Sequence, residues 1–202
     1  GGEVADNVSG WEAGGVYVVD SPITDVHIRG NQAAFAGGLE VRGEGHVVGC
    51  VVEGNTAQWY GGVMLMGNDY SLGNCRQEVA DSTVASNVAE IGGGIGLMQP
   101  RDAVVIRNTT ITDNQADSGA GIDVGSGSAP PVTITDSVIL RNVAALRGGG
   151  IALVQVGIAV EDSDLGEGAD DNVPDDAAIP DGTWGDYGAG STFQCTARRC
   201  LP

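Results

Sequence analysis

An acidic segment near the C-terminal end of the sequence holds the side chains best suited to bind a metal ion. Between Glu161 and Asp186 there are ten acidic residues and no basic one. Calcium takes about six to eight oxygen ligands from flexible, carboxylate-rich loops. A solvated loop that closes the end of the domain is the alternative. We predict at least one calcium ion, bound by Asp162, Asp164, Glu167, Asp170, Asp171, Asn172, Asp175 and Asp176.

A pair of carboxylates for glycoside hydrolysis is not indicated. Glu40 and Asp123 occupy equivalent positions of a repeat, three copies apart. If each copy adds one strand to a sheet, the two residues lie roughly 14 Å apart. Paired glycosidase carboxylates are separated by about 5–9.5 Å. We therefore expect no catalytic residues and no enzyme.

Four cysteines suggest covalent closure of loops. Cys50 and Cys75 bracket one repeat, and Cys195 and Cys200 are close in sequence. Two disulfides, Cys50–Cys75 and Cys195–Cys200, are the favoured interpretation, with free core thiols as the alternative. A zinc site is less favoured, because His27 and His46 have no cysteine pair at ligand spacing.

The elements that position these residues come from a repeat. An Asn is followed by a small residue, then by a Gly-rich pair, then by two apolar residues that flank one spacer. The intervals between successive Asn residues are 24, 24, 32, 27 and 28 residues. Self-similarity at this period indicates a solenoid. The repeated Asn residues, which we expect to form a structural ladder at one corner, are Asn7, Asn31, Asn55, Asn87, Asn114 and Asn142, and Asn172 begins a degenerate copy.

Three short strands fit into each repeat. Apolar pairs such as Val63 and Leu65 are two residues apart, which puts both side chains on one face of a strand. A second strand precedes each Asn, and a third lies between them, as at 103–106. The sequence predicts an all-β, single-stranded parallel β-helix of about six to seven coils. One inward column should contain Val16, Leu39, Val63, Ile95, Ile122 and Ile151, with the spacers Tyr17, Glu40, Met64, Gly96, Asp123 and Ala152 facing outward.

The fourth residue after each Asn forms another column, which is aromatic in the first three copies. These residues are Trp11, Phe35 and Trp59. We expect this column to stack inside the core. An outward-facing column would instead favour sugar binding.

The pattern resembles that of known secreted proteins. Asn-x-Ala-x-x-x-Gly-Gly-Ile is similar to the repeats of polymorphic outer-membrane-protein passengers and, more broadly, to the right-handed β-helix, pectate-lyase-like superfamily. The resemblance covers about residues 1–165 and implies a right-handed coil. Most copies have Val or Ile, not Phe, three residues before Asn, unlike the passenger motif.

Composition restricts the partners. The formal net charge is −18, with 27 acidic residues against nine arginines and no lysine. Such a charge argues against nucleic acids and anionic membranes. We expect one domain, with a repeat region at 1–160 and an acidic, disulfide-closed cap at 161–202. The expected function is a non-catalytic structural or adhesive protein, extracellular or at a bacterial cell surface, that self-associates head to tail or belongs to a larger surface protein. A carbohydrate-binding or carbohydrate-cleaving β-helix is the alternative.

Overall fold

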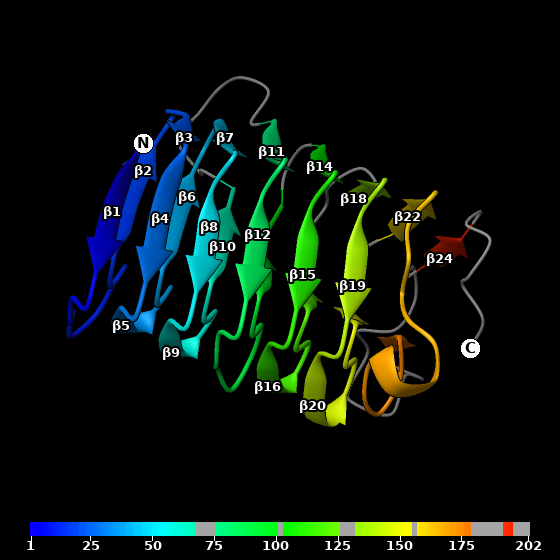
Figure 1. Cartoon of the computed structure of the whole chain (residues 1–202). Coiled ribbons are helices and arrows are strands. Elements are labelled where there is room, and N and C mark those ends of the chain that lie inside the picture. Colours follow the sequence, from blue (N-terminus) through cyan, green and yellow to red (C-terminus); the bar gives the residue numbers. More distant parts are fainter. Residues whose placement is uncertain (68–75, 101–102, 126–131, 155–156, 179–191, 196–202) are drawn as a thin grey trace.

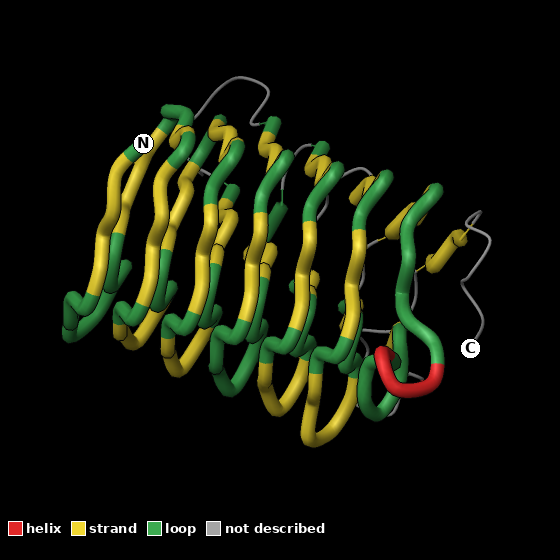
Figure 2. The backbone as a smooth tube through the Cα atoms, viewed as in Figure 1, coloured by secondary structure: helices red, strands yellow, loops and turns green. Residues whose placement is uncertain are grey.

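The computed structural model confirms a parallel β-helix (Figure 1). It describes residues 1–67, 76–100, 103–125, 132–154, 157–178 and 192–195, the last range for its backbone only. Every strand pair in it is parallel, and each strand pairs with the equivalent strands of the neighbouring coils. The backbone trace winds from one end of the solenoid to the other without a crossing connection (Figure 2).

Sheet I contains the strand that precedes each Asn. Its alternate residues, such as Ile28, Val52 and Val84, are fully buried. In spatial order the strands are β1 (Gly2–Ala5), β4 (Val26–Arg29), β8 (Val51–Glu53), β12 (Thr83–Ala85), β15 (Thr110–Thr112) and β19 (Val138–Leu140).

Sheet II contains the apolar pair that follows the glycines. The predicted inward column is confirmed, because Val16, Leu39, Val63, Ile95, Ile122 and Ile151 are partners in successive strand pairs. The strands are β2 (Val16–Val19), β6 (Leu39–Arg42), β10 (Val63–Met66), β13 (Ile95–Met98), β17 (Ile122–Val124), β21 (Ile151–Leu153) and β23 (Ala177–Ala178).

Sheet III closes the triangular cross-section. In spatial order it contains β3 (Ile23–Thr24), β7 (Gly45–Val48), β11 (Gln77–Ala80), β14 (Val104–Arg107), β18 (Val132–Thr135), β22 (Gly157–Glu161) and β24 (Thr192–Cys195). Two short pairs form the corner between sheets I and II: β5 (Gln32–Phe35) with β9 (Thr56–Trp59), and β16 (Gln115–Ser118) with β20 (Val143–Arg147).

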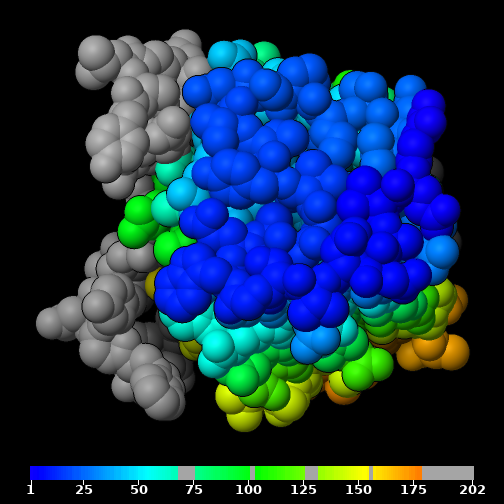
Figure 3. All heavy atoms as spheres, turned by 90° about the vertical axis from the view of Figure 1, so that its left-hand side faces the viewer, coloured from blue at the N-terminus to red at the C-terminus, as the bar shows by residue number. Residues whose placement is uncertain are grey.

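Close backbone packing explains the glycine pair of each repeat. A Cβ atom on Gly62 would lie 2.5 Å from the carbonyl oxygen of Gly94 in the next coil. A side chain at this position would therefore push the coils apart. The view along the solenoid shows the N-terminal part of the chain, drawn in shades of blue, over the middle of this face (Figure 3).

The acidic segment continues the solenoid. Val173 forms a parallel bridge with Val143, and β23 pairs with β21. A single turn of 3-10 helix spans Gly168–Asp170. Much of the predicted cap, at 179–191 and 196–202, lies outside the described residues. In the described part of the chain, no helix is long and apolar enough to cross a membrane.

Candidate functional site

A continuous ladder of asparagines fixes the corner between sheets I and II. The backbone N–H and the Nδ2 of Asn55 both donate to Oδ1 of Asn87, each at 3.0 Å. The Nδ2 of Asn87 also donates to the Val52 carbonyl oxygen, one coil back. The same bonds recur from Asn7 to Asn172, so the ladder has seven members. The first two residues after each Asn are in register from coil to coil in the paired corner strands, whereas the register shifts by one residue between Ser118 and Arg147.

The aromatic column (Trp11, Phe35 and Trp59) lies on the outside of this corner. Trp11 is 67% exposed and Trp59 is 37% exposed, while Phe35 is half-buried. The expectation that the column stacks inside the core was wrong. The inward position is the second after each Asn and is filled by small residues such as Ala33 and Ala57, because the corner has no room for a larger side chain.

The rings of the column touch one another across successive coils. The Trp11 and Phe35 centroids are 5.4 Å apart with planes at 59°, and those of Phe35 and Trp59 are 4.8 Å apart with planes at 84°. Tilted and edge-to-face contacts at this distance are favourable. The column is therefore a preformed, solvent-facing surface whose rings hold one another in place.

Apolar residues continue along the same corner beyond the column. Among the described residues, eight of the ten large hydrophobic side chains that are exposed lie on this corner, which we call the apolar strip. It runs past β5, β9, β16 and β20, along the lower edge of Figure 1. Exposed apolar surface of this extent marks interaction sites. Besides Trp11 and Trp59, the eight are Val8, Val88, Ile91, Val143, Leu146 and Val173.

Five of the six spacer residues of sheet II are buried, and only Tyr17 is exposed. Glu40 is fully buried and Asp123 is 6% exposed. Oε1 of Glu40 accepts a hydrogen bond from Nε of Arg42 at 2.5 Å, and its Oε2 has no hydrogen-bond partner. The same arginine bonds Glu12 at 2.9 Å and lies 5.3 Å from the Tyr17 ring centroid. Burial raises the pKa of the Glu40 carboxyl, and Arg42 opposes this effect.

The Tyr60 ring covers part of the same row. It packs with Ala36 and Met64 on the outer face of sheet II and lies over Gly96. Burial raises the pKa of Tyr60, and burial likewise raises the pKa of Asp123 to about 7. Glu40 and Asp123 are three strand positions apart, in β6 and β17. Strands β10 and β13 lie between the two acids, so the two carboxyl groups do not form a close pair.

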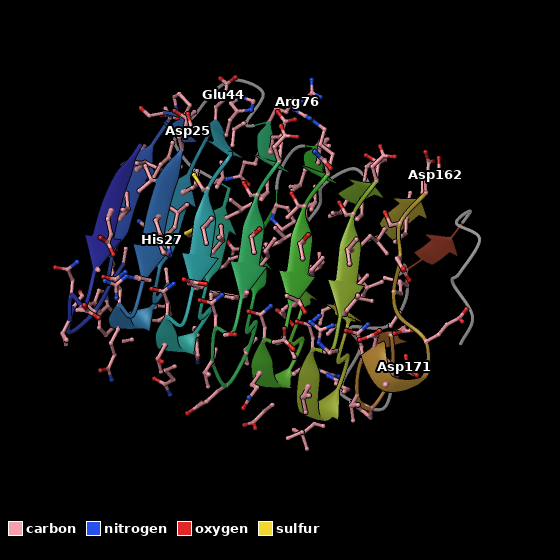
Figure 4. The ribbon with its side chains drawn as sticks, in the orientation of Figure 1. Asp25, His27, Glu44, Arg76, Asp162 and Asp171 are labelled. Atoms are coloured by element: carbon pink, nitrogen blue, oxygen red, sulfur yellow. The ribbon has the colours of Figure 1, made fainter. Side chains whose placement is uncertain are left out.

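The acidic segment is spread around the last described coil. Asp162 lies at the upper edge of the solenoid and Asp171 near the lower edge (Figure 4). In the described ranges, no group of three or more His, Cys, Asp or Glu side chains is placed to hold a metal ion. The eight predicted ligands therefore do not form one site, and calcium binding by the segment stays a prediction.

Several of these acids are engaged in hydrogen bonds that close the coil. Oδ1 of Asp170 accepts from Arg141 at 3.0 Å, and Oδ1 of Asp175 accepts from the Gly148 amide at 2.7 Å. Asn172 is the last member of the ladder, and its Nδ2 donates to Oδ1 of Asp176 at 2.9 Å. The segment thus satisfies the polar groups at the end of the asparagine ladder.

A comparison with known families agrees with this geometry. The model of the right-handed β-helix region matches residues 5–164, which is most of the chain. The chain belongs to the right-handed β-helix family. Neither a curated protein nor a solved structure matches it significantly. The match is consistent with the pectate-lyase-like superfamily and leaves the likeness to outer-membrane passengers as a resemblance.

Cys50 is a free, buried thiol in this β-helix, which differs from the predicted pairing with Cys75. Its Sγ lies against the carbonyl oxygens of Ile23 and Val48. The position is an interior one at the start of a sheet I strand, so its side chain faces the core. Cys75 and Cys200 lie outside the described residues, as does the side chain of Cys195, so the second disulfide stays a prediction.

A second set of polar hydrogen bonds precedes the sheet I strands of the β-helix and was not predicted from the sequence. Oγ of Ser82 accepts from the Cys50 amide at 3.1 Å and donates to the Ala80 carbonyl at 2.7 Å. The available signal was a small hydroxyl residue immediately before β12, β15 and β19. These hydrogen bonds join Cys50 to Ser82 and, farther along the solenoid, Thr109 to Ser137 and Ser137 to Ser163.

Proposed function

We propose that this protein is a non-catalytic, extracellular β-helix of a bacterium that adheres to a polysaccharide through its exposed aromatic column. The observation that carries the proposal is the outward position of Trp11, Phe35 and Trp59 on three successive coils. Aromatic faces stack against the C–H groups of pyranose rings, and a large ring buried at a contact supplies much of its affinity.

The surroundings of the column suit a sugar better than an apolar partner. Exposed Gln32, Thr56 and Gln58 lie on the same short strands and supply amide and hydroxyl groups beside the rings. These groups can donate to and accept from sugar hydroxyls. The centroid spacings of 5.4 and 4.8 Å are comparable to the length of one pyranose unit. One aromatic residue per coil therefore fits a chain that runs along the solenoid axis.

We propose no catalytic role for the buried acids Glu40 and Asp123. Glu40 is engaged with Arg42, and Asp123 lies three strands away. Paired glycosidase carboxylates sit about 5–9.5 Å apart on either side of the bond that they cleave. The rigid backbone of the coils would hold this pair too far apart for such a mechanism.

The test is binding to a panel of polysaccharides, compared between the native chain and the variant Trp11→Ala, Phe35→Ala, Trp59→Ala. We expect the variant to bind at least tenfold more weakly, which corresponds to about 1.4 kcal/mol. The matched control is Val19→Ala, which removes an exposed aliphatic side chain of β2, outside the apolar strip. Circular dichroism and the melting temperature check that both variants fold. Equal binding by the triple variant, or no binding to any polymer, would contradict the proposal.

Head-to-tail association is a second proposal that the ladder favours. Each Asn donates to the Oδ1 of the next coil, so Oδ1 of Asn7 faces away from the solenoid. Strands β1, β2 and β3 each have one edge without a partner among the described residues. Such an edge is a template for another strand, and a head-to-tail contact propagates into filaments. Light scattering over a concentration series tests this: a strictly monomeric species would contradict it.

A further inference from the structure

We infer that the polysaccharide bound along the apolar strip is a cationic amino-sugar polymer. This inference rests on the proposed function and adds the charge of the ligand to it. It is based on the acidic side chains that lie beside the aromatic column.

A row of polar side chains runs beside the apolar strip. The amide of Glu90 donates to the carbonyl oxygen of Gln58 at 2.9 Å, and the amide of Asp117 donates to that of Glu90 at 2.9 Å. The three residues are thus stacked on three successive coils. All three are exposed. Glu90 and Asp117 therefore present two carboxylates in line, one coil apart, along the direction of the solenoid axis.

The carboxylates follow directly on from the aromatic column. Trp59 and Ile91 form a parallel bridge between their coils, and Glu90 immediately precedes Ile91. A polymer stacked on the column and extended along the strip would pass beside Glu90 and then Asp117. Its first units would meet aromatic rings, and its later units would meet negative charge.

No base among the described residues neutralises these two acids. Neither Glu90 nor Asp117 has an ion pair there. The nearest base by register is Arg147, which pairs with Ser118 across β16 and β20. Its Nε donates to Oγ of Ser118 at 3.2 Å, and its charge partly opposes the rise in the pKa of Asp123 that burial causes. Arg141 is held by Asp113 and Asp170. The strip thus has unbalanced negative charge.

Charge complementarity then selects the ligand. The whole chain carries a net charge of −18, so a uronic acid polymer would be repelled both locally and at long range. A polymer with ammonium groups would be attracted, and its sugar rings would still stack on the column. Complementary charges at an interface give specificity and speed association. The occupant that meets both features is a chain of amino sugars with free amines.

The experiment compares three hexasaccharides: β-1,4-linked glucosamine, its fully N-acetylated form, and galacturonic acid. We expect affinity to decrease in that order. The double variant Glu90→Gln, Asp117→Asn should bind the glucosamine hexasaccharide roughly four- to 25-fold more weakly, since each exposed ion pair contributes a factor of roughly two to five. Its affinity for the N-acetylated form should not change. Added salt should weaken binding of the glucosamine hexasaccharide and leave binding of the N-acetylated form unchanged.

The matched control is Glu44→Gln, which removes an exposed carboxylate at the opposite edge of the solenoid (Figure 4). We expect it to bind all three hexasaccharides as the native chain does. Equal loss in this control would mean that only the overall charge matters, which would overturn the inference.

The remaining outcomes separate the inference from the proposed function. If the double variant binds glucosamine as the native chain does, while the aromatic triple variant loses binding, the proposed function stands and the inference is wrong. If the native chain binds none of the hexasaccharides but binds another polymer of the panel, the inference is wrong and the proposed function stands; if it binds no polymer at all, both fail. A lysine hexapeptide that binds equally to the native chain and the aromatic triple variant, and only weakly to the double variant, would overturn the choice of a sugar polymer.

Discussion

The ring of Tyr60 occupies the space in which any side chain on Gly96 would have to lie. A Cβ atom on Gly96 would lie 1.7 Å from Cδ1 and 2.3 Å from Cε1 of Tyr60. Tyr60 lies at one corner of the coil, and its ring covers part of sheet II, where it packs against Met64 and lies near Asp123. A spacer position without a side chain therefore allows the tyrosine to cover the sheet.

Gly96→Ala should destabilise the fold, because the ring must leave its packed position. Overpacking of this kind costs about 1–3 kcal/mol. Urea denaturation of the native chain and the variant measures the difference. Gly10→Ala is the control, since a Cβ atom there meets nothing within 4 Å. In a Tyr60→Ala background the cost of Gly96→Ala should fall, and an unchanged cost would show that the ring is not responsible.

Asn87→Ala should be much more damaging than Asn7→Ala. The first change leaves the backbone N–H of Asn55 without its acceptor, removes one of the two bonds donated by Asn55 Nδ2, and removes the bond to the Val52 carbonyl. Each buried polar group that loses its partner costs about 1–3 kcal/mol. We expect a loss of at least about 3 kcal/mol.

Asn7 lies at the exposed end of the same ladder, where the change removes one side-chain bond to Asn31. We expect a loss of at most about 1 kcal/mol, because water can replace that bond. Thermal unfolding of both variants measures the contrast. Equal losses at the two positions would mean that the ladder is not what holds the coils together.

Asp123→Asn should change the pH dependence of stability. Burial raises the pKa of Asp123 from 3.8 to about 7, so the folded chain retains a proton that the unfolded chain releases. Stability is lost as the pH rises from about 4 to 7. The variant has no carboxyl at this position and should not show this loss. The free energy of unfolding at pH 5, 6 and 8 tests this, and a difference between the two proteins that is constant with pH would contradict it.

Asp113→Asn should change the pH dependence of the free energy of unfolding in the opposite direction. The hydrogen bond from Arg141 lowers the pKa of Asp113 below 3.8. Its contribution is present above that pH and is lost as the pH falls through the folded-state value. The variant should therefore differ most from the native chain at neutral pH, and the difference should shrink in acid.

Cys50 should behave as a buried thiol. Burial raises its pKa, so alkylation should be slow in the folded chain and complete once the chain is unfolded without reductant. Mass spectrometry of the peptide measures both states. Cys50→Ser should fold with a stability within about 1 kcal/mol of the native value, because a hydroxyl can replace the thiol in the second set of polar hydrogen bonds. Resistance to alkylation in denaturant would instead reveal a disulfide.

The sequence by itself determined the repeat, the residues that face the core, and the stacking of equivalent positions in successive coils. Inward residues such as Leu39 and Val63 could be assigned because two-residue alternation and a recurring Asn are local features of the chain. Stacking of equivalent positions then follows from parallel pairing alone. The recurring spacing of the glycine pair has the same origin, because the glycines of each coil stack on those of the next.

Only the tertiary structure decided which side of each corner faces solvent and which outer positions are covered. Trp59 points outward because the three sheets leave room for no more than Ala57 inside the corner. Glu40 is buried because Arg42 and its neighbours lie over sheet II. Asp162 and Asp171, nine residues apart in sequence, are carried to opposite edges by the turn of the coil. These outcomes depend on the cross-section of the whole coil, which no repeat reveals when it is examined alone.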